Sequence, residues 1–224
     1  MLDDASITAL LLTLKLALLS TSILLVLGTP FAWWLTRTQW RGKSVLEALV
    51  ALPIVLPPTV LGFYLLVAFG PDGPVGILLS TFGMKTLNFT FTGLVIGSVI
   101  YSLPFVVQPL QHAFSQTDNR QLDAAATLGA SPWDRFFTIV IPQAKVGYLT
   151  ACVLGFAHTL GEFGVVLMIG GNIPNETRVV SIAIYDHVES MEYSQAHTLA
   201  ATLLCVSFVM LLITYVSKQY WGRK

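Results

Sequence analysis

Long apolar runs separated by short polar stretches dominate the chain. Five runs are long enough to cross a bilayer, because a hydrocarbon core of about 30 Å needs roughly 20 apolar residues in a helix. The predicted spans cover residues 7–35, 46–69, 91–110, 146–168 and 199–216. Tryptophan and tyrosine residues lie mostly near the ends of these runs, as is typical of a membrane interface. The pattern predicts an all-α integral membrane protein with a single transmembrane domain, 1–224.

The basic residues divide unevenly between the connections. Nine lie in the first connection, the third connection and the tail, and two lie in the remaining outer regions. The nine are Arg37, Arg41, Lys43, Arg120, Arg135, Lys145, Lys218, Arg223 and Lys224, and the two are Lys85 and Arg178. Because cytoplasmic loops carry the excess of Lys and Arg, we expect the N-terminus outside and the C-terminus inside.

The stretch between the last two spans is less regular. Residues 170–178 (GGNIPNETR) have the composition of a loop. Residues 179–188 are apolar but too few to cross, and a sixth span would place the basic tail outside. We therefore expect a short outer or re-entrant helix here. Irregular backbone at membrane depth is tolerated only where it is buried in protein or lines a wet cavity.

Composition narrows the function classes. The chain is 54% hydrophobic and 11% charged, with a formal net charge of +0, so nucleic-acid binding has no electrostatic support. The four histidines lie at different depths and no HExxH pattern occurs, so we expect no metal site. The stretch 41–44 (RGKS) lacks the earlier glycine of a phosphate-binding loop. We therefore expect no cofactor in this chain.

The third connection, 118–142, has the signals of a folded loop. Asp118 is a plausible N-cap for a helix over 120–128, and Gly129 fits the position that ends it. Ser131 then starts a second helix, with proline at its first position and Asp134 three residues after the cap. A structured cytoplasmic element of this kind is suited either to docking in a partner's groove or to resting on lipid.

Two stretches inside the spans are candidate pore or gate elements. A carboxylate at membrane depth, as in residues 158–164 (HTLGEFG), usually pairs or lines a polar path. Alternatively, Glu162 is held by Arg178 or by backbone donors and has no direct role in transport. Prolines in residues 52–62 bend a helix, either as a hinge or as simple kinked packing. The candidates are Pro57, Pro58, Thr159, Gly161, Glu162 and Gly164.

The third connection resembles the EAA motif of ABC importer permeases. The matching positions are Asp123, Ala124, Ala125, Gly129, Ile139, Ile141 and Pro142. Aspartate replaces the usual glutamate and Ile141 replaces the usual leucine. The resemblance implies that 118–142 is the cytoplasmic EAA loop, with a coupling helix seated in a separate ATPase subunit that binds the ATP.

The chain resembles the molybdate ABC transporter permeases over nearly its whole length. The resemblance is carried by residues 52–66 and 160–189 and by the short five-span length. This implies a type I ABC importer permease fold in the bacterial cytoplasmic (inner) membrane. It also implies a homodimer on two ATPase subunits and a periplasmic molybdate-binding protein, for which Asn172, Pro174 and Arg178 are docking candidates. Molybdate would be the substrate and tungstate a second one.

Two alternatives stay open. A related ABC importer permease for sulfate, thiosulfate or another oxyanion would share this build. A membrane enzyme or a channel acting alone would need catalytic or selectivity motifs in the spans, and we find none that is convincing.

Overall fold

The computed structural model describes residues 3–221, with side chains up to residue 217. Every regular element in that part of the chain is a helix. In chain order these are α1 (Asp4–Arg37), α2 (Lys43–Val55), α3 (Pro58–Phe69), α4 (Pro74–Thr81), α5 (Phe91–Ser115), α6 (Asn119–Thr127), α7 (Pro132–Arg135), the π-helix η1 (Phe136–Val140), α8 (Ile141–Gln143), α9 (Lys145–Leu160), α10 (Gly164–Gly170), α11 (Val180–Glu189) and α12 (Tyr193–Trp221).

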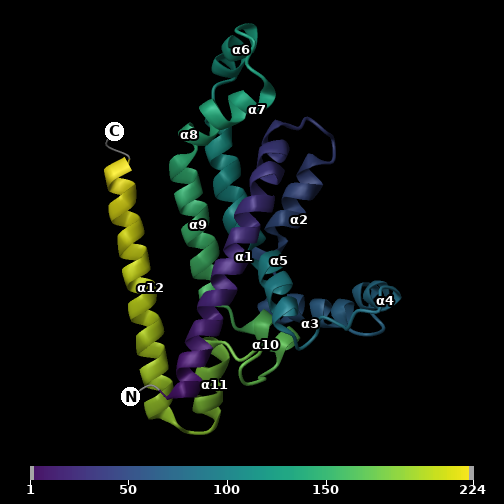
Figure 1. Ribbon diagram of the computed structural model, residues 1–224, viewed down its shortest axis with the longest axis vertical. Helices are drawn as coiled ribbons and strands as arrows, with labels where there is room; N and C mark the ends of the chain where they lie inside the picture. The colour runs from purple at the N-terminus through teal and green to yellow at the C-terminus, as the bar shows by residue number, and fades with distance from the viewer. Residues whose placement is uncertain (1–2, 222–224) are drawn as a thin grey trace.

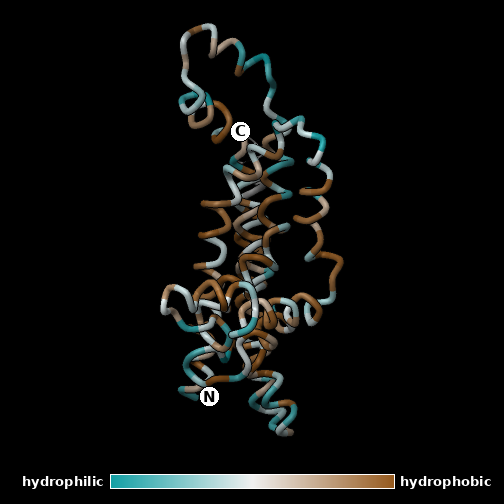
Figure 2. Tube along the Cα trace, turned by 90° about the vertical axis from the view of Figure 1, so that its right-hand side faces the viewer, coloured by the Kyte–Doolittle hydropathy of each residue, from teal (hydrophilic) through white to brown (hydrophobic). Residues whose placement is uncertain are grey.

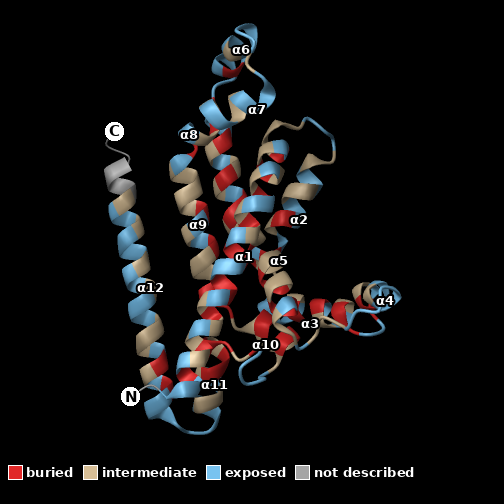
Figure 3. Cartoon of the chain, in the orientation of Figure 1, coloured by how far each residue is buried: buried red, intermediate tan, exposed pale blue. Residues whose placement is uncertain are grey.

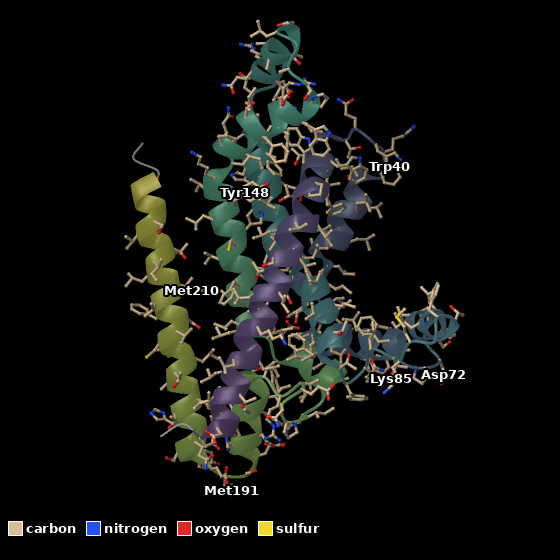
Figure 4. All side chains as sticks on the ribbon, viewed as in Figure 1. Trp40, Asp72, Lys85, Tyr148, Met191 and Met210 are labelled. Atoms are coloured by element: carbon tan, nitrogen blue, oxygen red, sulfur yellow. The ribbon has the colours of Figure 1, made fainter. Side chains whose placement is uncertain are left out.

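An elongated bundle forms the body of the molecule. Helices α1, α2, α5 and α9 run along its long axis, and α12 stands at one edge (Figure 1). Helices α6 and α7 lie at one end of the bundle. Helices α10 and α11, with the first turns of α1 and α12, lie at the other. We call these the α6 end and the α11 end. Figure 4 places Trp40 near the first and Met191 at the second.

The core consists of two clusters of buried apolar side chains, and α1 and α5 contribute to both. Near the α6 end, Leu24, Val106, Leu110 and Phe114 are buried in one apolar cluster. A second cluster nearer the α11 end joins α1, α3, α5, α10 and α11. Buried residues concentrate on these helices, whereas α12 is mostly exposed (Figure 3).

Hydrophobic residues predominate along the middle of the bundle, and hydrophilic residues are frequent in the loop at the α6 end (Figure 2). Phe208 on α12, for example, has 62% of its surface exposed. Such a broad exposed apolar surface is unusual for a protein in water and is satisfied by lipid.

The expectation of about five spans is confirmed. Four helical segments among the described residues are long and apolar enough to cross a membrane. They are 4–37, 58–81, 91–115 and 193–217. A fifth arises if 132–143 and 145–160, which meet at a bend of 72°, form one span.

The second predicted span, 46–69, is not one continuous helix. It breaks between α2 and α3, and the segment that qualifies as a span is 58–81. Leu56 (ψ 136°) and Pro57 (ψ 135°) are both extended, because each precedes a proline whose ring disfavours the helical conformation before it. After the break, α3 leaves the bundle sideways and carries α4 at its tip, near the labelled Asp72 and Lys85 (Figures 1 and 4).

The fourth predicted span, 146–168, is also interrupted. Helix α9 ends at Leu160, and α10 begins only at Gly164. The expected short helix follows as α11 and lies at the α11 end beside α1 and α12. The backbone N–H of Val180, at its first turn, donates to Oγ1 of Thr13 over 2.8 Å. This bond satisfies one of the free amides of the helix start.

Candidate coupling and translocation sites

The predicted coupling helix forms as α6. The Asp118 carboxylate caps it by accepting from the backbone N–H of Arg120 at 2.9 Å. The helix ends in a Schellman motif, in which Ala130 N–H donates to the Ala125 carbonyl and Gly129 N–H to the Ala126 carbonyl, both at 3.0 Å. Gly129 has a φ of +87°, a conformation that costs glycine little and other residues more.

The second predicted helix starts as expected and then departs from α-helix. Ser131 and Asp134 form a full capping box around α7. The Ser131 hydroxyl and backbone N–H, both bonded to the Asp134 carboxylate, hold the pKa of that carboxyl below its usual range. After four residues the chain continues as η1, and it reaches α9 through the bend of 72°. π-Helical turns of this kind are frequent at functional sites.

The EAA-like residues lie along this loop with different exposures. Asp123, Ala124, Gly129 and Pro142 are exposed, and the other three positions are half-buried. Leu128, next to the glycine, has 88% of its surface exposed. The end of α6 around Leu128 and Gly129 therefore offers a small, partly apolar exposed surface.

A groove of about 610 Å³ runs between α2, α5 and α9 towards the α6 end. Its lining mixes apolar walls with scattered amides, a hydroxyl and an imidazole. The polar lining residues are Gln108, His112, Gln116, Gln143 and Thr150. None of these residues was a sequence candidate. However, positions 101, 105, 108 and 112 follow helical spacing and so share one face of α5, and Gln116 continues this spacing at the C-cap. That recurrence was the signal available in the sequence.

A second hollow of about 540 Å³ lies where α9 breaks. It brings together Pro58, Gly161, Glu162 and Gly164, four of the predicted pore candidates. Tyr101, His158 and Thr59 complete its polar wall. Because Tyr101 lies one turn from the first groove's Phe105 on α5, the two hollows follow one helix face in succession.

Close backbone approach shapes the wall of this hollow. A Cβ on Gly164 would lie 2.7 Å from Cβ of Pro58, and a Cβ on Gly62 would lie 2.8 Å from Cβ of Met168. Only glycine leaves room for α3 and α10 at these two points. The proline break and the α9–α10 break are thereby packed directly together.

The other two pore candidates do not line either hollow. Pro57 lies in the break before α3. Thr159 is buried, and its hydroxyl lies 2.9 Å from that of Ser102 while also donating to the Gly155 carbonyl at 3.0 Å. Ser102 also lies 2.9 Å from Nδ1 of His158. These contacts join α5 to α9 beside the hollow.

Glu162 is 4% exposed, and neither carboxyl oxygen has a hydrogen-bond partner among the described residues. The Ser98 hydroxyl lies nearby, but it is also buried without a hydrogen-bond partner among the described residues. The alternative in which Arg178 holds Glu162 is wrong. Arg178 instead bonds Oδ1 of Asn172 at 2.5 Å and pairs with Asp186 at 3.6 Å.

The predicted docking residues lie on the loop between α10 and α11. Asn172 also donates to Asp186 at 3.1 Å. The contacts among Asn172, Arg178 and Asp186 therefore hold this loop against α11. Pro174 lies on the exposed rim of this loop. This loop lies at the end of the molecule opposite to α6 (Figure 1).

Comparison with known proteins identifies the family. Residues 7–222 match the model of the "Binding-protein-dependent transport system inner membrane component" family. The chain belongs to this family. It is therefore a multi-pass inner-membrane component of a transport system that depends on a binding protein, and not an enzyme by itself.

Two molybdenum permeases are similar over almost their full length, and a sulfate permease is similar over about two thirds of its length. The molybdenum transport system permease protein of Azotobacter vinelandii is 59% identical over 98% of this chain and 97% of its own. The molybdenum permease of Escherichia coli K12 is 35% identical, over 99% and 96%. The sulfate transport system permease protein of a Synechocystis strain is also 35% identical, over 89% of this chain and 69% of its own.

Solved structures show the same fold. A bacterial ABC transporter for import of the acidic polysaccharide alginate superposes with a TM-score of 0.80 at 17% identity, over 98% of this chain and 80% of that one. The MetNI methionine ABC transporter gives 0.71 at 14% identity, over 98% and 99%. The fold is that of type I ABC importer permeases, which work with an ATPase and a binding protein.

Proposed function

We propose that the chain is the membrane-spanning subunit of an ATP-driven importer for molybdate, with tungstate as a second substrate. The observation that carries this proposal is the 59% identity to the molybdenum permease of Azotobacter vinelandii over almost the full length of both chains. The partners would be two copies of an ATPase, a periplasmic molybdate-binding protein and a second copy of this chain. The N-terminus would lie outside and the α6 end in the cytoplasm.

Sulfate transport is the second candidate, because identity alone does not separate the more distant relatives. The Escherichia coli molybdenum permease and the Synechocystis sulfate permease are both 35% identical to this chain. Length favours molybdate, since the match covers 96% of the first and only 69% of the second. The 59% relative points the same way.

The substrate path would follow the α5 face that connects the two hollows. Apart from Glu162, its polar lining consists of amides, hydroxyls and imidazoles, with no lysine or arginine. A dianion would meet neutral hydrogen-bonding groups there and would be held weakly, which suits passage because tight binding slows release. Glu162 would not hold the anion directly, because its carboxyl oxygens are shielded from solvent.

The experiment is uptake in a bacterial strain that lacks its own molybdate importer. The chain is expressed with its ATPase and its binding protein, and cellular molybdenum is measured by mass spectrometry at limiting external molybdate. Uptake that tungstate inhibits and excess sulfate does not inhibit would support the proposal. Sulfate accumulation without molybdenum accumulation would assign the chain to the sulfate importers.

A further inference from the structure

Helix α6 stands away from the bundle and needs an anchor. It has nine residues, fewer than an isolated helix needs to be stable in water. Leu122 is its only buried residue. The helix projects from the rest of the molecule (Figure 1). Its orientation must therefore be set by a few contacts beneath it.

Arg37, the last residue of α1, makes one of these contacts. Its guanidinium lies over the ring of Trp33, 4.5 Å from the centroid, and Nη1 donates to Oδ1 of Asn119 at the start of α6. Stacking on an aromatic ring fixes the plane of the guanidinium and so directs its donors. Asn119 is thereby tied to the end of the longest helix in the bundle.

Trp33 is itself held on two sides. Its ring packs edge-on against Phe114 of α5 at 5.5 Å and lies 5.4 Å from Phe136 of η1. Phe114 is fully buried. The support under Arg37 thus joins α1, α5 and η1, and a force on Asn119 reaches all three.

Two further contacts hold the rest of α6. Nη1 of Arg135 donates to the Leu122 carbonyl at 3.4 Å, and Nε2 of Gln143 donates to Oε1 of Gln121 at 2.5 Å. The first is long and weak. The bond from Arg37 is the one among these that starts from a bundle helix, since Arg135 and Gln143 belong to the same loop as α6.

The contacts surround a hollow of about 240 Å³ that also contains Asp123. Nε and Nη2 of Arg37 and Nε of Arg135 are shielded from solvent and have no partner among the described residues. Asp123 lies within electrostatic reach of Arg37 but forms no ion pair with it. If α6 shifts, Arg37 can therefore form a new hydrogen bond to the nearby Asp123 carboxylate, because some of its donors are unpaired among the described residues.

We propose that Arg37 is a positioning residue that ties α6 to α1, so that a displacement of α6 moves the first span. This inference rests on the proposed role of α6 in contacting an ATPase. A purely structural role would make Arg37 matter for folding or assembly alone. The two roles differ in one measurable quantity, the amount of substrate imported per ATP hydrolysed.

The test uses the complete transporter, with its ATPase and binding protein, in proteoliposomes. Arg37→Gln removes the charge, and Arg37→Lys keeps the charge without the planar donors. Asn119→Ala removes the acceptor while leaving Arg37 in place. Arg41→Gln is the matched control, because Arg41 is exposed in the α1–α2 connection and its side chain forms no ion pair with another described residue. Assembly is measured by co-purification of the ATPase.

We expect Arg37→Gln to assemble and to hydrolyse ATP, but to import roughly tenfold less molybdate per ATP, the scale of losing one hydrogen bond from a charged group. Asn119→Ala should give a similar loss, the double variant no more, and Arg37→Lys partial recovery. Full coupling in Arg37→Gln would overturn the inference. If Arg37→Gln fails to assemble, full coupling in an assembled Asn119→Ala transporter would overturn it. Failure of the wild-type protein to import molybdate would instead contradict the proposed function.

Discussion

The hydroxyl of Ser102 on α5 lies 2.9 Å from Nδ1 of His158 on α9. The His158 ring is stacked against Phe105, with centroids 3.9 Å apart, and lies 4.6 Å from Tyr101. The imidazole is therefore fixed in orientation at the wall of the hollow beside Glu162. A histidine in an apolar span is held by hydrogen bonding and aromatic packing and not by a second charged group.

Ser102→Ala should destabilise the protein, because it leaves Nδ1 of His158 without its partner inside the bundle. The expected loss is about 1–3 kcal/mol, measured as a lower midpoint of thermal unfolding in detergent. Ser20→Ala is the control, since the Ser20 hydroxyl is equally buried but has no hydrogen-bond partner in the part of the chain that the structure describes. Equal effects of the two substitutions would contradict the importance of the Ser102 contact.

Gly129→Val should impair coupling through backbone strain. No atom lies within 4 Å of a Cβ added at Gly129, but its φ of +87° is unfavourable for a β-branched residue by about 1–2 kcal/mol or more. We expect weaker ATPase co-purification and lower uptake. Gly83→Val has the same open surroundings, with a φ of +70°, just after α4 on the α3–α4 arm. It should retain coupling, and equal losses at both sites would point to general misfolding.

Gly62→Ala should be poorly tolerated where Gly28→Ala is accepted. The added Cβ at Gly62 would lie 2.8 Å from Cβ of Met168 and 3.2 Å from Cα of Val165, so backbone must move. Such overpacking typically costs about 1–3 kcal/mol. At Gly28 the nearest atoms are side-chain methyls at 3.6 Å. Thermal unfolding of both variants measures the difference, and a stable Gly62→Ala protein would contradict the close packing of α3 on α10.

The α7 capping box should weaken in acid. The Ser131 hydroxyl and amide lower the folded-state pKa of Asp134, so its contribution is complete above the unfolded-state pKa and is lost as the pH falls through the folded-state value. Hydrogen exchange of the backbone amides of Ser131, Trp133, Asp134 and Arg135, corrected for intrinsic rates, should therefore accelerate at acidic pH, below the ordinary carboxyl range. Asp134→Asn should exchange faster at neutral pH and lose most of this pH dependence. A pH-independent wild-type profile would contradict the assignment.

The spans and the coupling loop were predictable from local patterns. Apolar run length placed the long helices, and Asp118, Gly129 and Ser131 marked the ends of α6 and the start of α7 through capping rules that act within a few residues. The breaks were harder to predict. Consecutive prolines at 57 and 58 predicted a bend in a helix, but the sideways course of α3 depends on its packing against α10 through Gly62 and Gly164, which are about 100 residues apart.

The contact of Arg37 with Asn119 was also invisible in the sequence. Its partners are 82 positions apart, and a basic residue at the end of a span is explained equally well by the membrane potential and the lipid surface. The pairing of Arg178 with Asp186 was also missed, although the two residues are only eight positions apart, because it depends on how the loop before α11 packs against that helix. Such side-chain pairs are set by tertiary structure, whereas caps and helix faces are set by spacing.

Glu162→Gln should raise stability and lower transport. The buried carboxyl has no hydrogen-bond partner in the described structure, and burying such a group costs more than burying a neutral amide of the same shape. We expect a gain of about 1–3 kcal/mol in unfolding free energy. Proteins retain a costly polar group of this kind chiefly where function requires it, so uptake should fall.

The control for Glu162→Gln is Asp72→Asn, which makes the same chemical change at an exposed carboxylate on the α3–α4 arm (Figure 4). It should leave both the unfolding midpoint and uptake unchanged. A lower midpoint in Glu162→Gln would mean that the carboxyl has a partner that stabilises it, such as ordered water. Unchanged uptake with a higher midpoint would assign Glu162 to packing at the α9–α10 break, and the polar path would then depend on the α5 face alone.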